Sequence, residues 1–357
     1  IYFFVYALIF LKKMDNIIYF SIIVLSIFYL NKLFINKNLL LSHSGDKHQE
    51  FASKTSVPLI GGIFLIVLFI LFLTELNKYY ETIIIFFIFL LGIFTDLKIL
   101  KSPKKRLLIQ AFFIIFLAFF SKLEIIDTRI EFFNSVLEYK FINFCFVVFC
   151  LLILMNGSNF IDGLNGLLVG YFIMITIILI KIDFFQYHET KFDEILFFLS
   201  VLFVIFLFNI FNKLYLGDNG VYAISIFFGL MIVNFHQNHP IISPYFFILL
   251  LWYPCFENLF SIIRKFSFKK SPINADNNHL HQLVYYYLKK KIIITKLNIN
   301  NLSSFLIILY NLFVFILSLN YLSNSQFQII MVLVNIIIYL IVYFKLFTFK
   351  YRINSSY

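Results

Sequence analysis

Long apolar runs separated by short polar loops make up almost the whole chain. A helix needs about 20 mostly apolar residues to cross the bilayer core, and fewer when its ends lie among neighbouring helices. The pattern therefore predicts an all-α polytopic integral membrane protein with about ten to eleven transmembrane helices. The predicted segments are 17–34, 57–74, 82–95, 107–120, 141–155, 163–182, 194–212, 220–235, 241–263, 303–320 and 327–345.

The composition supports a membrane protein and excludes an ordinary soluble domain. Of 357 residues, 62% are hydrophobic and 13% are charged, whereas soluble domains average about half apolar and a quarter charged. A net charge of +11 could indicate a nucleic-acid partner, but Lys and Arg also accumulate in the cytoplasmic loops of multi-span proteins. We therefore expect the lipid bilayer, and no nucleic acid, as a partner.

The positive charges predict which loops face the cytoplasm. The loop after the first segment, and every second loop after it, together carry most of the 29 Lys and Arg residues. The positive-inside rule makes that side cytoplasmic, in a multi-pass protein of the cell inner (cytoplasmic) membrane. Residues 1–13 are too short to span and precede Met14, so we interpret them as an upstream extension of one transmembrane domain over 14–357.

The unusual polar residues all fall on the predicted cytoplasmic side, in five loops. Asp96, Asp162 and Asp218 stand at predicted helix ends, where an ionised group is costly unless it is paired or binds a cation. Carboxylate and amide oxygens suit hard cations such as Mg²⁺, usually together with substrate phosphates. Basic residues in the same loops suit a polyanionic substrate. They are Lys54, Lys98, Lys101, Arg106 and Lys213. This set predicts Mg²⁺-dependent chemistry on a diphosphate, in loops that face the cytoplasm.

Each of these features also has a simpler structural interpretation. A single Asp at a helix end is more often an N-cap or a solvated interfacial residue. Gly61 and Gly62 serve helix packing as readily as backbone contact with a phosphate. His279 and His281 have the spacing of a zinc pair, but the sequence offers no evident third ligand nearby. Only the joint placement of the polar residues on one side favours a binding site.

Five motifs, in order, resemble those of the polyprenyl-phosphate N-acetylhexosamine-1-phosphate transferases, also called glycosyltransferase group 4. This family includes the undecaprenyl-phosphate GlcNAc-1-phosphate transferases. The motifs are PLIGG at 58–62, TDLKILKSPKKRLLIQ at 95–110, NGSNFIDGLNG at 156–166, LGDNG at 216–220 and NADNNHLH at 274–281. They are similar to the family's PxxGG, DDxx…RLxxQ, NxxNFxDGxDG, (F/L)GDxG and ADxxHxHH. The resemblance covers roughly residues 40–290.

The resemblance implies a reaction and assigns roles. A polyprenyl-phosphate oxygen attacks the sugar-linked phosphate of a UDP-N-acetylhexosamine, UMP leaves, and a lipid-linked cell-envelope glycan is begun. Mg²⁺ is the implied cofactor, with Mn²⁺ as the alternative. Asp218 and Asp162 are the expected metal ligands, and Asp96, Asp162 and Asn159 are the expected catalytic residues. The predicted substrate-binding residues are Lys54, Lys98, Arg106, Asn165, Lys213, His279 and His281. We also allow for a homodimer.

Three positions depart from the family pattern. Thr95 replaces the first Asp of the DD pair, Asn165 replaces the second Asp of DGxDG, and Gln282 replaces the last His. We favour an active enzyme because a lipid phosphate is already largely ionised near pH 7 and needs little base strength. The alternatives are a catalytically degenerate homologue that binds a lipid-linked sugar, and a transporter or flippase. Transporters usually place ionisable groups near the bilayer midplane, which the one-sided acids argue against.

Overall fold

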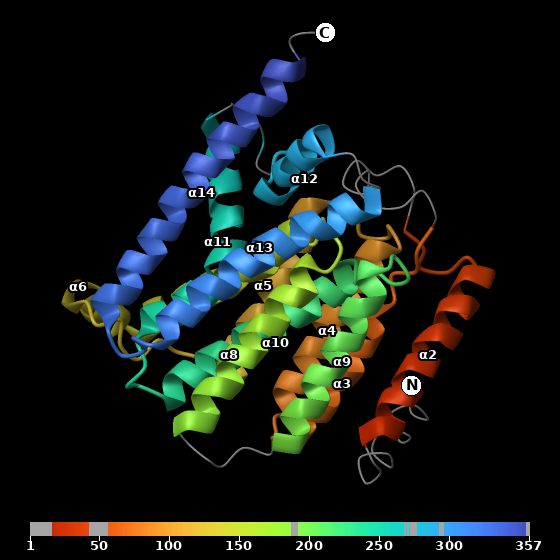
Figure 1. Cartoon of the computed structure of the whole chain (residues 1–357). Coiled ribbons are helices and arrows are strands. Elements are labelled where there is room, and N and C mark those ends of the chain that lie inside the picture. The colour runs from red at the N-terminus through yellow and green to blue at the C-terminus, as the bar shows by residue number, and fades with distance from the viewer. Residues whose placement is uncertain are drawn as a thin grey trace.

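The computed structural model describes residues 16–42, 56–186, 192–267, 269, 271, 277–292 and 296–354 (Figure 1). The predicted extension over 1–13, Lys54 and residues 274–276 of the last motif lie outside them.

Each predicted segment overlaps one helix. These helices are α2 (Asn16–Asn36), α3 (Gly61–Glu75), α4 (Tyr79–Asp96), α5 (Pro103–Phe120), α7 (Lys140–Ile161), α8 (Leu167–Gln186), α9 (Phe192–Ile210), α10 (Gly217–Asn238), α11 (Pro244–Ser267), α13 (Lys296–Leu319) and α14 (Ser325–Asn354). The structure adds two short helices, α6 (Glu131–Leu137) and α12 (Leu280–Lys291).

The helices confirm an all-α polytopic membrane fold. By length and composition, six helices in the described part of the chain are suited to cross a membrane, namely α4, α7, α10, α11, α13 and α14. Helices α2, α3, α8 and α9 contain shorter apolar stretches. The outward faces of the helices are apolar. On α14, for example, Ile337, Ile341 and Phe344 are exposed. Apolar faces of this extent are not left to water in a soluble monomer, so we interpret them as lipid-facing.

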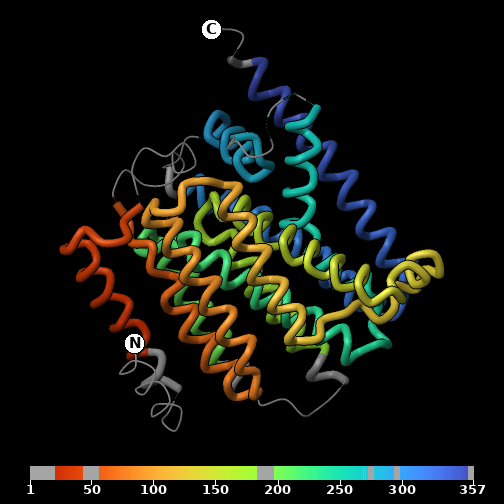
Figure 2. The backbone as a smooth tube through the Cα atoms, turned by 180° about the vertical axis from the view of Figure 1, so that it is seen from behind, coloured from red at the N-terminus to blue at the C-terminus, as the bar shows by residue number. Residues whose placement is uncertain are grey.

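Helix α10 is the centre of the bundle. It packs against α3, α4 and α7, while α2 and α14 lie at opposite edges (Figures 1 and 2). Phe227 of α10 stacks on Phe69 of α3 with ring centroids 4.1 Å apart, and Phe198 of α9 stacks on Phe227 at 5.3 Å. Such aromatic pairs add to the stabilisation from burial. The beginning of α10, which carries Asp218, therefore rests on a well-packed core.

The buried segment before α3 is not helical and bonds to two other parts of the chain. Helix α3 begins at Gly61 and not at residue 57 as predicted. The reason is Pro58, because proline lacks an N–H and disfavours helical structure at the residue before it. The N–H of Leu59 donates to the carbonyl of Leu40 at 2.7 Å. The N–H of Tyr215 donates to the carbonyl of Pro58 at 3.0 Å, and Gly61 donates back to Tyr215 at 3.0 Å. These bonds tie the first and fourth motif segments together.

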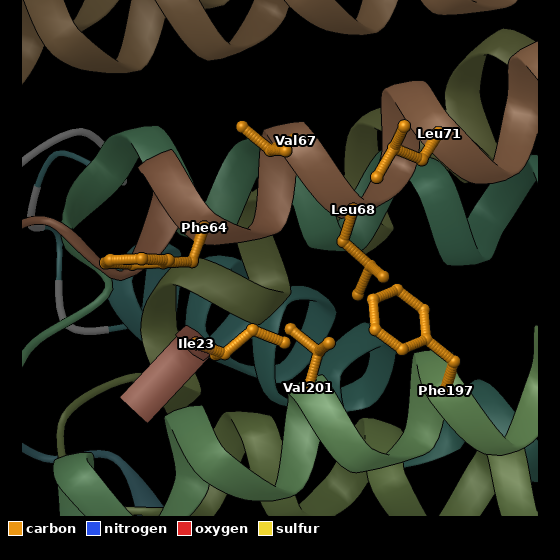
Figure 3. A pocket seen from close by; sticks show the side chains of 7 residues that line it. All are labelled: Ile23, Phe64, Val67, Leu68, Leu71, Phe197 and Val201. Carbon is orange, nitrogen blue, oxygen red and sulfur yellow. The ribbon is translucent and has the colours of Figure 1, made fainter. Parts of the chain in front are cut away.

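An apolar hollow between α2, α3 and α9 offers nothing to a charged substrate. Figure 3 shows its lining side chains, which carry only carbon, because all are aliphatic or Phe. They are Ile23, Phe64, Val67, Leu68, Leu71, Phe197 and Val201. A phosphate placed there would lose its hydration without gaining a donor. The candidate site therefore has to be sought where the polar motif segments meet.

A proline in α11 creates a specific need on α8. Pro254 lies inside α11 and has no N–H to donate to the carbonyl of Leu250, four residues earlier. The hydroxyl of Tyr171 on α8 donates to that carbonyl at 2.8 Å. A buried carbonyl without a donor is costly, so Tyr171 restores the bond that the proline removes.

We expect Tyr171→Phe to destabilise the protein by about 1–3 kcal/mol, because it leaves the Leu250 carbonyl buried and unpaired. Thermal unfolding of the purified protein in detergent would measure the change. Tyr253→Phe is the matched control, since the buried Tyr253 hydroxyl has no hydrogen-bond partner among the described residues. Equal losses of stability in the two variants would contradict the assignment.

Candidate active site

The carboxylate of Asp96 caps the amino-terminal end of α10 by accepting backbone N–H groups. Asp96 is the last residue of α4. Its Oδ1 accepts the N–H of Asp218 at 2.9 Å, and its Oδ2 accepts the N–H of Asn219 at 3.1 Å. The first N–H groups of a helix have no partner within the helix, and a negative charge there is favourable. Asp96 therefore joins the second and fourth motifs and fixes where α10 begins.

Glycines allow three helices to meet at this point. A Cβ atom on Gly92 of α4 would lie 2.5 Å from the backbone N of Asn219. A Cβ atom on Gly62 of α3 would lie 2.6 Å from the Cα of Gly220. Helices α3, α4 and α10 approach so closely only because these positions lack side chains. For Gly62 the structure favours the packing interpretation over contact with a phosphate.

Asp218, the second residue of α10, is the centre of a polar cluster. Its Oδ2 lies 3.4 Å from Nη1 of Arg106 on α5 and accepts the hydroxyl of Tyr222 at 3.3 Å. The side chain of Asn159 on α7 also lies beside this carboxylate. The carboxylate and the guanidinium are each about one-quarter exposed or less, so their attraction is less screened than on an open surface. The fold thus brings Arg106 and Asn159, both predicted from the sequence, to Asp218.

Asp162 brings a third carboxylate to the cluster. It directly follows α7 and is partly buried. Burial, and then the charges of Asp218 and Asp96, raise the pKa of Asp162 well above its usual value. No hydrogen-bond donor among the described residues reaches its carboxylate, whereas Asp96 and Asp218 both have donors. Asp162 is therefore the uncompensated acid of the three.

The donor set fits a magnesium ion. Within the described ranges, no three His, Cys, Asp or Glu side chains already surround a metal position. Mg²⁺ does not need such a cage, because it keeps several waters and is held by one or two carboxylates plus substrate phosphates. Asp162 and Asp218 can supply those carboxylates, and a cation would relieve their mutual repulsion. Both oxygens of Asp96 are occupied by α10, which makes Asp96 the weaker ligand candidate.

Two histidines border the cluster at the start of α12. His281 is fully buried, and a Cβ atom on Gly163 would lie 2.6 Å from its Nε2, so the ring rests against the residue after Asp162. Burial and the neighbouring His279 hold the pKa of His281 well below its usual value. Neither ring nitrogen of His281 has a hydrogen-bond partner in the described part of the chain. The ring of His281 therefore has hydrogen-bonding capacity that no described residue uses.

The fold does not bring every predicted residue to the cluster. The side-chain amide of Asn165 donates to Asn212 at 2.7 Å, and its backbone N–H donates to Asn300 at 2.8 Å. These bonds fasten the third motif to the end of α9 and to α13. Lys98 and Lys213 are exposed near the ends of α4 and α9. Substrate binding by these three residues stays a prediction.

Several residues of the site were missed in the sequence. Asn219 is fully buried and donates to the carbonyl of Leu59 at 3.1 Å. Tyr222 could have been found from its spacing, since it stands four residues after Asp218 on one helix. Glu257 is the sole acid in α11, and an ionisable residue inside a membrane span is a functional candidate in its own right. It binds His279, as described below.

Fold and site together define a polytopic membrane protein in which acids, an arginine and histidines gather where several helices end. Residues 79–236 match the model of the family described as glycosyl transferase family 4, in agreement with the resemblance seen in the sequence. The match spans α4 to α10 and so includes Asp96, Arg106, Asp162 and Asp218. A comparison with curated proteins finds no match. This match supports an enzyme, a polyprenyl-phosphate sugar-1-phosphate transferase in general terms.

Proposed function

We propose that the protein transfers an N-acetylhexosamine-1-phosphate from a UDP-sugar to polyprenyl (undecaprenyl) phosphate and releases UMP. The observation that carries the proposal is the meeting of Asp96, Asp162 and Asp218 with Arg106 around the first turn of α10. Carboxylates that hold a cation, beside a guanidinium, suit a diphosphate substrate.

The reaction needs positioning and charge neutralisation more than covalent help from the protein. An oxygen of the lipid phosphate attacks the sugar-linked phosphorus of the UDP-sugar. A new P–O bond forms while the bond to the bridging oxygen breaks, and UMP leaves with that oxygen. Arg106 is positioned to attract the diphosphate, because its guanidinium already faces the acid cluster. Asp162 and Asp218 would hold Mg²⁺, which supplies positive charge when bound.

The remaining residues have supporting roles. Asn159 lies beside the Asp218 carboxylate. Asp96 holds the turn that carries Asp218. The neutral ring of His281 can donate one hydrogen bond and accept another, which suits a phosphate or a sugar hydroxyl. We place the site on the cytoplasmic side of the inner membrane, because the positive loops lie there. A homodimer and a lipid-linked cell-envelope glycan as the eventual product stay predictions.

The decisive test combines the three proposed components. Purified protein is incubated with undecaprenyl phosphate, Mg²⁺ and each member of a panel of UDP-sugars, and UMP is measured. We expect UMP only when all three are present, with UDP-N-acetylglucosamine as the first donor to try. EDTA should stop the reaction, and Mg²⁺ or Mn²⁺ should restore it. UMP formed without the lipid would indicate hydrolysis instead.

Folded protein that releases no UMP with any donor would contradict the proposal. A degenerate homologue would then be the better interpretation, and binding of a lipid-linked sugar would test it.

A further inference from the structure

A buried acid on α11 joins three elements at the edge of the site. Glu257 is 1% exposed. Its Oε1 lies 2.9 Å from Nδ1 of His279. Its Oε2 accepts the hydroxyl of Tyr339 on α14 at 2.9 Å and the N–H of Leu280 at 3.3 Å. Helix α11, α14 and the first turn of α12 therefore meet at one carboxylate.

The partners of Glu257 determine the state of His279. The backbone N–H of Leu280 can only donate, and the Tyr339 hydroxyl donates to the same oxygen. These two donors on Oε2 match an ionised carboxylate, and an ionised carboxylate can only accept, so we infer that Nδ1 of His279 carries the proton in its 2.9 Å contact with Oε1. When the neutral ring is protonated at Nδ1, its Nε2 is an acceptor. The acid on α11 thereby selects one tautomer.

Packing fixes the plane of the same ring. The His279 ring lies against Phe160, with centroids 4.8 Å apart, and parallel to His281 at 5.8 Å with an interplanar angle of 9°. Phe160 stands between the site residues Asn159 and Asp162 in the sequence. His279 thus lies against the third motif, in an orientation that the fold holds constant.

We propose that Glu257 is a positioning residue for the transferase. Together with Tyr339 it fixes the tautomer and orientation of His279 so that the ring meets the nucleotide-sugar in one defined state. The inference rests on the proposed function, since it names a nucleotide-sugar as the partner of His279. The rival interpretation is that Glu257 only anchors α12, because it also accepts the Leu280 N–H.

A double-mutant cycle separates the two interpretations. Glu257→Gln and His279→Gln should each lower kcat/KM for the UDP-sugar by about tenfold to a hundredfold, the range for residues that orient a functional histidine. The double variant should be no worse than His279→Gln, because both changes remove one interaction. The KM for polyprenyl phosphate should change by less than about twofold. Tyr339→Phe should give a smaller loss in the same direction.

Lys350→Met is the matched control for anchoring. Its ammonium donates to the carbonyl of Asn277 at 2.7 Å and to Oδ1 of Asn278 at 2.8 Å, so it anchors the same segment from α14. This change should leave kcat/KM within about threefold, and its effect should multiply with that of His279→Gln. Multiplying losses for Glu257→Gln and His279→Gln would overturn the positioning role.

A spectroscopic readout makes the inference independent of turnover. Protein labelled with [¹⁵N]histidine in lipid bilayers would show the ring nitrogens, with the His279 signals identified by their loss in His279→Gln. We expect a ring protonated at Nδ1 in the native protein and a second, Nε2-protonated form in Glu257→Gln. Unchanged signals would overturn the inference even if UMP is released. If no donor yields UMP but the signals change as expected, the proposed function fails while Glu257 still fixes the ring.

Discussion

Asp218→Asn is expected to reduce UMP release by about a thousandfold, without loss of the fold. The change removes one negative charge from the centre of the acid cluster and leaves Arg106 beside a neutral amide. A transition state that depends on preorganised charge loses most when that charge is removed inside a partly dehydrated site. Initial rates with UDP-sugar, polyprenyl phosphate and Mg²⁺ would measure the loss.

The comparison needs an acid that is remote from the site. Asp127 lies between α5 and α6, beyond the end of α5 opposite to Arg106, and bonds locally to Arg129 and Asn134. Asp127→Asn should therefore retain turnover within about threefold. Raising Mg²⁺ should not restore Asp218→Asn fully, because Asp162 alone holds the cation poorly. Turnover above about one-tenth of the native rate in Asp218→Asn would exclude Asp218 as a metal ligand.

Gly92→Ala is expected to have the largest effect on folding. A Cβ atom there would lie 2.5 Å from the backbone N of Asn219 and 2.7 Å from the carbonyl C of Asp218. Backbone at the beginning of a packed helix cannot rotate away as a side chain can, so α4 and α10 would have to separate. Overpacking costs about 1–3 kcal/mol and occasionally more. The same separation would pull Asp96 from α10, so activity should fall with stability.

Gly229→Ala tests whether the loss of stability in Gly92→Ala arises because the contacted atoms are backbone and not side chain. Gly229 lies in α10 itself, and a Cβ atom there would meet Cδ2 of Leu151 at 2.5 Å. A leucine methyl can move by a change of rotamer, so this variant should lose about 1 kcal/mol or less. Thermal unfolding and the yield of monodisperse protein would compare the two. Equal behaviour would show that backbone contact at Gly92 is not the decisive feature.

Much of the fold could be predicted because a membrane span has a strong one-dimensional signal. Each apolar run became a helix, but several boundaries differ from the predicted ones. Helix α3 begins after Pro58, α7 continues through residues 156–161, which were predicted as a loop, and α14 extends to Asn354. Helices α6 and α12 were missed because they are short and not apolar enough to resemble spans. The family resemblance was likewise available from five ordered motifs, and the match over residues 79–236 agrees with it.

The site was predictable in part. Spacing pointed to Asp96, Asp162 and Asp218, and the fold brings their charges together. The sequence could not reveal that both carboxylate oxygens of Asp96 accept N–H groups at the start of α10, or that the side chain of Asn165 donates to Asn212. Those outcomes depend on which helix ends meet, and residues 122 positions apart in the chain meet at Asp96 and Asp218.

The sequence by itself determined the class of the protein and pointed to the family whose model matches residues 79–236, because hydropathy and ordered motifs are local properties of the chain. Only the tertiary structure decided which polar groups are paired. Burial makes each unpaired group costly, and the partner of a buried group is set by helix packing, not by sequence spacing. Glu257 is an example. The sequence shows only a single acid in an apolar run, whereas the structure shows that its carboxylate contacts His279, Leu280 and Tyr339.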